Sequence, residues 1–120
     1  MEDLTDAQIG SQRKTLTDLK HQIETTLSQS REAARPVELD QQVVGRLSRI
    51  DAIQQQKMVE ANRRRQGLRL KQVKAALLAM NSGDYGVCRR CEESIAWPRL
   101  QAQPECFICL DCQARLEQKR

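Results

Sequence analysis

The chain has 120 residues and a mass of 13.8 kDa, which suits one domain or an elongated element that carries a small module. Its three aromatic residues, Tyr85, Trp97 and Phe107, all lie in the last third, so we expect the first two thirds to pack in a narrow seam. No apolar run approaches the roughly 18 residues of a membrane span, which excludes a transmembrane protein. The acidic, polar N-terminus is unlike a secretory signal. We therefore expect a cytoplasmic protein.

The net charge of +4 is distributed unevenly along the chain. Residues 1–60 hold 8 basic and 10 acidic side chains, whereas residues 61–83 hold only basic ones: Arg63, Arg64, Arg65, Arg69, Lys71 and Lys74. Such a block can attract a polyanion or an acidic protein face. The alternative interpretation is a solvated helix face beside an acidic partner helix.

Residues 5–33 are predicted to form a helix. Thr5 is a suitable N-cap, and Asp6 follows in the first turn, where negative charge suits the helix dipole. One face carries an apolar stripe: Leu16, Leu19, Ile23 and Leu27. Pro36 is expected to end this helix, because the residue before a proline is disfavoured in the α region.

A longer helical pattern runs from about residue 42 to residue 81. Its apolar stripe begins with Val43, Leu47 and Ile50 and ends with Leu70, Val73, Leu77 and Met80. We expect the helix to continue through Gly67 with some local softness and to stop at Gly83. The two helices suggest an antiparallel hairpin, whose narrow seam needs support at its base.

The strongest signal is the C-x2-C-x17-C-x2-C arrangement of Cys88, Cys91, Cys109 and Cys112. Two turns that each present two thiolates can surround one zinc ion with four sulfurs in a tetrahedron. Four protein ligands leave no open coordination position, so the predicted zinc is a single structural ion rather than a catalytic one. Thiol redox chemistry is an alternative, weakened because no βαβ pattern surrounds the cysteines. The other alternative is that the cysteines only pack as small apolar residues.

The other reactive residues give weaker evidence of a functional site than the four cysteines do. Cys106 could compete with Cys112 as partner of Cys109, but we prefer the later pair. Cys106 is then interpreted as a bystander, with a redox-responsive thiol or an occasional replacement ligand as alternatives. His21 is the only histidine and is expected on a helix surface. The three aromatic residues are expected to form a small apolar cluster around the zinc. No catalytic triad, phosphate loop or helix-borne zinc protease motif is present, so we expect no enzyme.

The segment from Gly83 to Cys112 resembles the DksA/TraR family of bacterial transcription regulators. The shared features are the entry Asp84-Tyr85-Gly86-Val87-Cys88, the x17 gap, and the proline of Ala102-Gln103-Pro104 five residues before Cys109. The resemblance implies a mainly α fold: an antiparallel two-helix coiled-coil hairpin over residues 1–82, with its tip at about 35–51. It also implies a small four-cysteine zinc-finger module with a C-terminal helix over residues 83–120.

The resemblance implies a direct partner, RNA polymerase, whose secondary channel receives the hairpin tip so that initiation is modulated. Membrane binding and sequence-specific DNA binding are not expected. The family's Asp-x-x-Asp-x-Ala tip motif is missing, and the candidate tip acids here are Asp40, Asp51 and Glu38. Asp40 could instead only cap the second helix. The six basic residues of 61–83 are candidates for partner contact.

Family members often act with guanosine tetraphosphate through basic residues near the module's proline and last cysteine. Gln103 and Gln113 occupy those positions here and lack the cation that a phosphate needs, although Arg65 and Lys71 remain on the second helix. This argues against dependence on the alarmone. The alternative function is a zinc-knuckle nucleic-acid-binding protein, in which the basic residues face phosphates.

Overall fold

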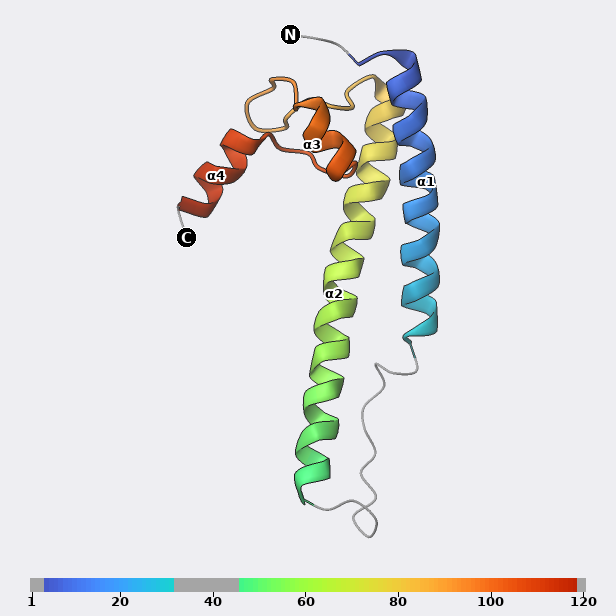
Figure 1. Cartoon of the computed structure of the whole chain (residues 1–120), viewed down its shortest axis with the longest axis vertical. Helices are drawn as coiled ribbons and strands as arrows, with labels where there is room; N and C mark the ends of the chain where they lie inside the picture. Colours follow the sequence, from blue (N-terminus) through green and yellow to red (C-terminus); the bar gives the residue numbers. More distant parts are fainter. Residues whose placement is uncertain (1–3, 32–45, 119–120) are drawn as a thin grey trace.

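The structure is a computed structural model that describes residues 4–31 and 46–118. It contains four helices in these ranges: α1 (Asp6–Gln29), α2 (Arg46–Ser82), α3 (Trp97–Ala102) and α4 (Leu110–Gln118). The long helices α1 and α2 run antiparallel and side by side, and the molecule measures 65 × 33 × 20 Å (Figure 1). Its described part has no sheet, only one isolated bridge between Val87 and Ser94. The expected fold class, mainly α with a helical hairpin and a four-cysteine module, is confirmed. In the described ranges no helix has the length and apolar character required to cross a bilayer.

Helix α1 begins where its capping residues predict. The Thr5 hydroxyl accepts the Gln8 backbone N–H, and the Gln8 side chain accepts the Thr5 N–H, which together form a capping box. The helix ends at Gln29, earlier than the predicted residue 33 and well before Pro36. The reason lies in its last turn, where the Ser30 hydroxyl and the Arg63 guanidinium both donate to the carbonyl oxygen of Leu27. These donors replace the N–H groups of a continued helix.

Helix α2 is continuous from Arg46 to Ser82, so the predicted continuity through Gly67 is confirmed. The predicted start at residue 42 lies outside the described residues. The helix ends at Gly83 as expected, because this glycine adopts the left-handed conformation with φ +79°. The N–H groups of Gly83 and Asp84 then donate to the carbonyls of Met80 and Ala79, at 3.3 and 2.8 Å. This pattern is a Schellman motif, which satisfies the last carbonyls of the helix.

The apolar stripes of the two helices meet in the hairpin. Leu16 and Ile23 of α1 and Val73 and Met80 of α2 are buried, while other stripe residues are partly buried against them: Leu19, Leu27, Leu70 and Leu77. Ile50 was predicted to begin the α2 stripe, but it is exposed because α1 ends before reaching its level. The predictions for Val43 and Leu47 lie outside the residues whose side chains are described. The seam therefore packs best near the zinc module.

A buried polar network joins the hairpin to the module. The Gln12 side-chain amide of α1 donates to the Tyr85 hydroxyl at 3.1 Å and to the Leu100 carbonyl at 2.7 Å. Tyr85 in turn donates to the carbonyl of Pro104 at 2.9 Å. Burial raises the pKa of the Tyr85 phenol, so the hydroxyl stays protonated and keeps this donor. One glutamine of the hairpin thus holds two separate segments of the module.

Gly86 is required where the chain enters the module. Its φ is +85°, and a Cβ added there would lie 2.9 Å from Leu4 Cδ1. We expect Gly86→Ala to lower the free energy of unfolding by about 1–2 kcal/mol from backbone strain, since the Leu4 contact can shift. Gly10→Ala is the matched control: Gly10 lies inside α1 with open space around it, so alanine should raise stability by about 0.5–1 kcal/mol. Urea unfolding of both variants measures the difference, and equal stabilities would contradict this assignment.

Candidate metal centre

The first knuckle is a tight turn that carries Cys88 and Cys91. The N–H of Glu92 donates to the Cys88 carbonyl at 2.9 Å, and the Cys88 N–H donates to the Glu93 carbonyl at 2.8 Å. Glu92 occupies the left-handed region with φ +63°, which reverses the chain. The Arg90 N–H lies 3.4 Å from the Cys88 sulfur and donates to it. The turn therefore presents its sulfurs and also stabilises negative charge on one of them.

The second knuckle opens directly into α4. The N–H of Cys112 donates to the Cys109 sulfur at 3.5 Å, and the N–H of Gln113 donates to the Cys109 carbonyl at 2.9 Å. The Cys109 sulfur therefore accepts one of the N–H groups that are left unpaired at the start of α4. The predicted C-terminal helix of the module corresponds to α4, which begins at Leu110. The Arg89 N–H, which donates to the Phe107 carbonyl at 2.9 Å, joins the two knuckles.

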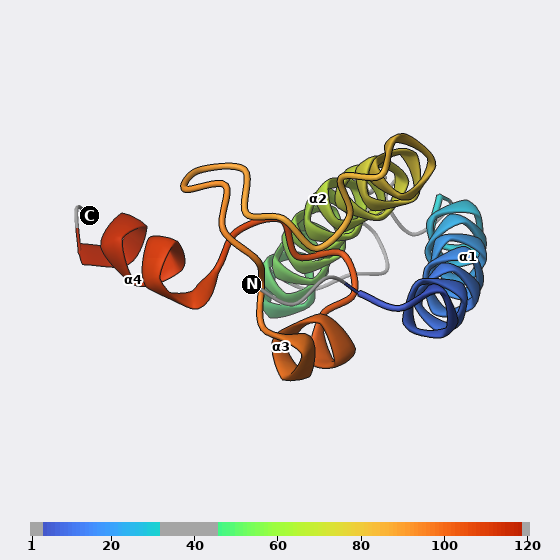
Figure 2. The same ribbon diagram turned by 90° about the horizontal axis from the view of Figure 1, so that it is seen from above.

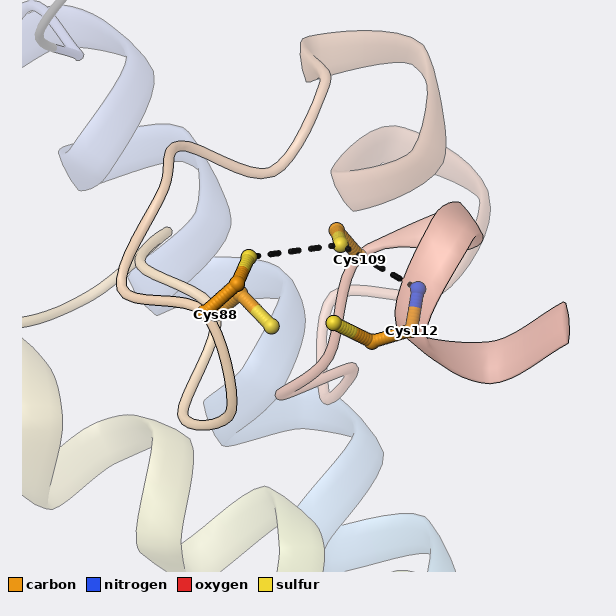
Figure 3. A group of neighbouring side chains, drawn as sticks. Cys88, Cys109 and Cys112 are labelled. Atoms are coloured by element: carbon orange, nitrogen blue, oxygen red, sulfur yellow. Dashed lines mark hydrogen bonds between the residues drawn. The ribbon is translucent and has the colours of Figure 1, made fainter. Parts of the chain in front are cut away.

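The structure brings Cys88, Cys91, Cys109 and Cys112 together. Their sulfur atoms all lie within 4.8 Å of one another, and those of Cys91 and Cys109 are 3.6 Å apart. Cys88 faces Cys109 and Cys112 across the gap between the knuckles (Figure 3). Four sulfurs at about 2.3 Å from a tetrahedral zinc ion are separated by about 3.8 Å, so this donor set fits one zinc ion. Zinc held by four thiolates has no open position and serves to fold the module.

The thiols of the cluster differ in acidity. Burial opposes ionisation of Cys88, but backbone N–H groups of Cys91, Cys109 and Arg90 donate to its sulfur and lower its pKa to about 6. Hydrogen bonding to Cys109, followed by burial, raises the pKa of Cys112 to about 12. At neutral pH the cluster thus offers a thiolate at Cys88 first. Zinc binding must displace protons from its neighbours, as metal binding to thiols requires.

Two further predictions concern residues near the four-sulfur cluster, namely Cys106 and the aromatic side chains. Cys106 lies outside the four-sulfur cluster and is partly buried, and burial raises the pKa of its thiol more than Arg99 lowers it. The predicted aromatic cluster around the zinc is wrong for Phe107, whose side chain is 42% exposed. Tyr85 is buried and Trp97 partly buried, but aliphatic residues fill most of the module core: Ile95, Leu100 and Ile108.

A buried carboxylate connects the module to α2. Glu105 is one of two buried polar or charged residues in the described part of the chain, and its Oε1 accepts from Arg69 Nε at 3.2 Å. Its Oε2 is buried without a hydrogen-bond partner. The Arg69 side chain is 43% exposed, so the pair is buried on one side only. Sequence reasoning assigned Arg69 to partner contact and did not single out Glu105.

Removal of the Arg69 cation should destabilise the protein more than removal of the Glu105 charge. Arg69→Ala leaves a buried carboxylate without its cation and should cost about 2 kcal/mol of unfolding free energy. Glu105→Gln keeps the side-chain volume, removes the charge and should cost less than about 1 kcal/mol. In the Arg69→Ala background, Glu105→Gln should therefore restore stability. Denaturant unfolding of the two single variants and the double variant tests this, and a double variant less stable than Arg69→Ala would contradict it.

The other predicted site residues are spread along the hairpin. Asp51 is exposed in the second turn of α2, whereas Asp40 and Glu38 lie outside the described residues. Arg63 is engaged at the end of α1, where it donates to Leu27 and to Ser30 Oγ. The other four cations of the block are exposed: Arg64, Arg65, Lys71 and Lys74. The basic block thus has two structural members and four that face solvent.

The folded unit is a four-cysteine zinc finger at the base of a long helical hairpin. Residues 83–118 match the prokaryotic dksA/traR C4-type zinc finger. Over 56 residues the chain is 36% identical to the RNA polymerase-binding transcription factor DksA of Haemophilus influenzae, an alignment that covers 47% of this chain and 39% of that protein. The match thus spans about two fifths of the relative's length.

Solved structures share the whole fold. Transcription factor DksA2 of Pseudomonas aeruginosa superposes with a TM-score of 0.74 at 20% identity, over 95% of this chain and 86% of that one. The RNA polymerase binding protein and transcriptional regulator Dks of Chlamydia trachomatis gives a TM-score of 0.56 at 21% identity, over 97% and 94% of the two chains. Residues 83–118 thus carry a zinc finger of the dksA/traR type, and the chain as a whole shares the fold of these solved structures.

Proposed function

We propose that the chain binds RNA polymerase and regulates transcription initiation by placing the end of its hairpin in the secondary channel. The observation that carries this proposal is the combination of a DksA/TraR zinc finger with a helix of 37 residues that projects from it. At 1.5 Å per residue α2 is about 55 Å long, which suits a probe that reaches into a larger assembly. The Haemophilus influenzae relative is named for binding RNA polymerase, which supports the same partner here.

In this proposal the chain has two functional parts. Residues 1–82 form the reaching hairpin, with its tip at about 35–51, and residues 83–120 form the zinc module that anchors it. The protein acts by binding rather than by catalysis, because four thiolates leave the zinc no position for a substrate. It acts in the cytoplasm, where RNA polymerase works. We propose that Asp51, together with Asp40 and Glu38, supplies the acidic groups of the tip.

Guanosine tetraphosphate is not required in this proposal. The positions at which the family resemblance implies basic contacts carry Gln103 and Gln113, and Gln113 donates to Glu117 within α4. Neither side chain provides a cation for a phosphate. We therefore expect the alarmone to change the protein's effect on promoter complexes by less than about twofold, an order-of-magnitude bound for a site without charge-assisted hydrogen bonds.

The test combines binding with promoter kinetics. Purified protein is mixed with RNA polymerase, recovered by pulldown, and assayed for its effect on the half-life of open promoter complexes. Asp40→Asn with Asp51→Asn should keep polymerase binding but lose most of the kinetic effect, because the tip no longer carries these charges. Asp18→Asn is the matched control, since Asp18 is an exposed acid in the middle of α1.

Three outcomes would contradict the proposal. Polymerase that never co-purifies with the wild-type protein removes the partner. An unchanged kinetic effect of the double variant removes the tip assignment. Binding to DNA alone that weakens steeply with salt, by roughly one power of salt concentration per phosphate contact, would instead support the nucleic-acid-binding alternative.

A further inference from the structure

Helix α2 carries a second stripe of residues that α1 does not cover. Leu68 and Leu78 are 61% and 67% exposed. They belong to a series spaced alternately four and three residues apart, which we call the outer face of α2: Lys57, Ala61, Arg64, Leu68, Lys71, Ala75 and Leu78. Such spacing keeps all seven residues on one side of a helix.

The outer face lies opposite the hairpin core. At 100° per residue, its centre is about 160° around α2 from Val73 and Leu77, which pack against α1. The views along and across the hairpin place α1 on one side of α2 and α4 on another (Figures 1 and 2). The outer face is thus left uncovered by α1, although its spacing is that of a helix-pairing surface.

The zinc module lies beside the outer face of α2. A cavity of about 180 Å³ lies between α2 and the module, with Ala75 and Ala79 on the helix side and Val87 and Phe107 on the module side. Val87 and Phe107 are 37% and 42% exposed. An apolar side chain from outside could therefore contact α2 and the module at once. Phe107 does not pack in the core around the zinc, but it lines this cavity.

The charges on the outer face define what can lie on it. Its three charged members, Lys57, Arg64 and Lys71, recur every seven residues and are all cations. All three are exposed, and none forms an ion pair with a described residue. Arg89, a fourth exposed cation, lines the cavity with Lys71. Two acids, Asp84 and Glu105, also line it, but Glu105 is already held by Arg69.

We propose that the outer face of α2 docks an acidic amphipathic helix of a partner protein. In this complex, apolar side chains of the partner pack on Ala61, Leu68, Ala75 and Leu78, and one of them enters the cavity beside Phe107. Carboxylates of the partner helix meet Lys57, Arg64 and Lys71. A second copy of this chain would place cations against cations, and a nucleic acid would leave the leucines without apolar partners. This surface lies along the shaft of the hairpin and is independent of the tip.

A designed peptide provides the probe. It is a fluorescently labelled 21-residue helix with leucine or alanine at two positions of every heptad and glutamate at a third, flanking position. We expect it to bind the full-length, zinc-loaded protein in a fluorescence-anisotropy titration, with affinity that falls as salt is added. Leu68→Glu combined with Lys71→Glu should weaken binding by at least about tenfold, since both the apolar contact and the charge attraction are lost.

Matched controls separate docking from general stickiness. Met58→Glu and Lys74→Glu change an exposed apolar and an exposed basic residue of α2 that lie off the outer face, and they should leave the affinity within about twofold. A peptide with lysine in place of each glutamate should bind at least about tenfold more weakly. The proposal is overturned if the acidic peptide does not bind, if both peptides bind equally, or if Leu68→Glu with Lys71→Glu has no effect. Association of the chain with itself that buries Leu68 would assign the surface to a second copy instead.

Discussion

Removal of zinc is expected to unfold residues 83–118. Apparent binding free energies of structural zinc in small zinc fingers are about 10–16 kcal/mol, comparable to or larger than the total stability of an ordinary domain. The module core is small, and two of its buried members, Cys88 and Cys112, belong to the metal cluster itself. Incubation with a strong chelator should therefore abolish the helical signal of α3 and α4, measured by circular dichroism and by hydrogen exchange of residues 97–118.

Two cysteine variants test which thiols hold the zinc ion. Cys88→Ser removes a sulfur that is fully buried in the cluster, so the zinc content of the purified protein should fall from one ion per chain to near zero. Cys106→Ser is the matched control, since Cys106 is three residues from Cys109 but outside the cluster. It should retain its zinc. A chelated protein that keeps the exchange protection of α3 and α4, or a Cys106 variant that loses its zinc, would refute the assignment of the centre.

Replacement of Gln12 by methionine should cost about 2–3 kcal/mol of unfolding free energy. Methionine preserves the length and volume of the side chain, but it cannot donate to the Tyr85 hydroxyl or to the Leu100 carbonyl. The residue is only 4% exposed, so water cannot replace these hydrogen bonds without rearrangement. Thermal and urea unfolding of the zinc-loaded protein measure the loss.

Gln22→Met is the matched control for this substitution. Gln22 is on the same helix but exposed, so the same chemical change should shift stability by less than about 0.5 kcal/mol. Gln12→Met should also increase hydrogen exchange in α3, because the Leu100 carbonyl belongs to that helix. Equal stabilities of the two variants would show that the polar network does not hold the module on the hairpin.

Local signals in the sequence predicted the start of α1, the end of α2 and the metal cluster. Thr5 with Gln8 defines the start of α1, and Gly83 defines the end of α2, because each terminus is stabilised by residues within a few positions along the chain. The four clustered cysteines were predictable for the same reason, since each knuckle is a local turn. His21 is exposed as expected.

Contacts between distant segments were not predictable in this way. The end of α1 depends partly on Arg63, a residue 36 positions from the Leu27 carbonyl that it binds. Gln12 and Glu105 look like ordinary surface residues in the sequence, and only their partners in the folded chain explain their burial. Helix α3 did have a local signal that was missed, because Pro98 in its first turn is a common feature of helix starts.

The different roles of the six basic residues in 61–83 were also not predictable, because they depend on contacts between distant segments. The six cations in the acid-free stretch 61–83 were interpreted as candidates for partner contact or as a solvated helix face. In the folded chain Arg63 and Arg69 turn to neighbouring segments, because a helix points successive residues in different directions. The sequence could show that the positive charge was concentrated, but not which members remained available to a partner.

The uninterrupted course of α2 has a mechanical consequence. A helix about 55 Å long acts as a lever, so a tilt of about 5° at its base moves its far end by about 5 Å. That displacement exceeds the length of a hydrogen bond, so in the proposed function it would separate an acidic group at the tip from the group that it contacts. Small errors of alignment at the metal-bearing end are therefore magnified at the far end, and the directional bonds of Gln12 and Arg69 limit such errors.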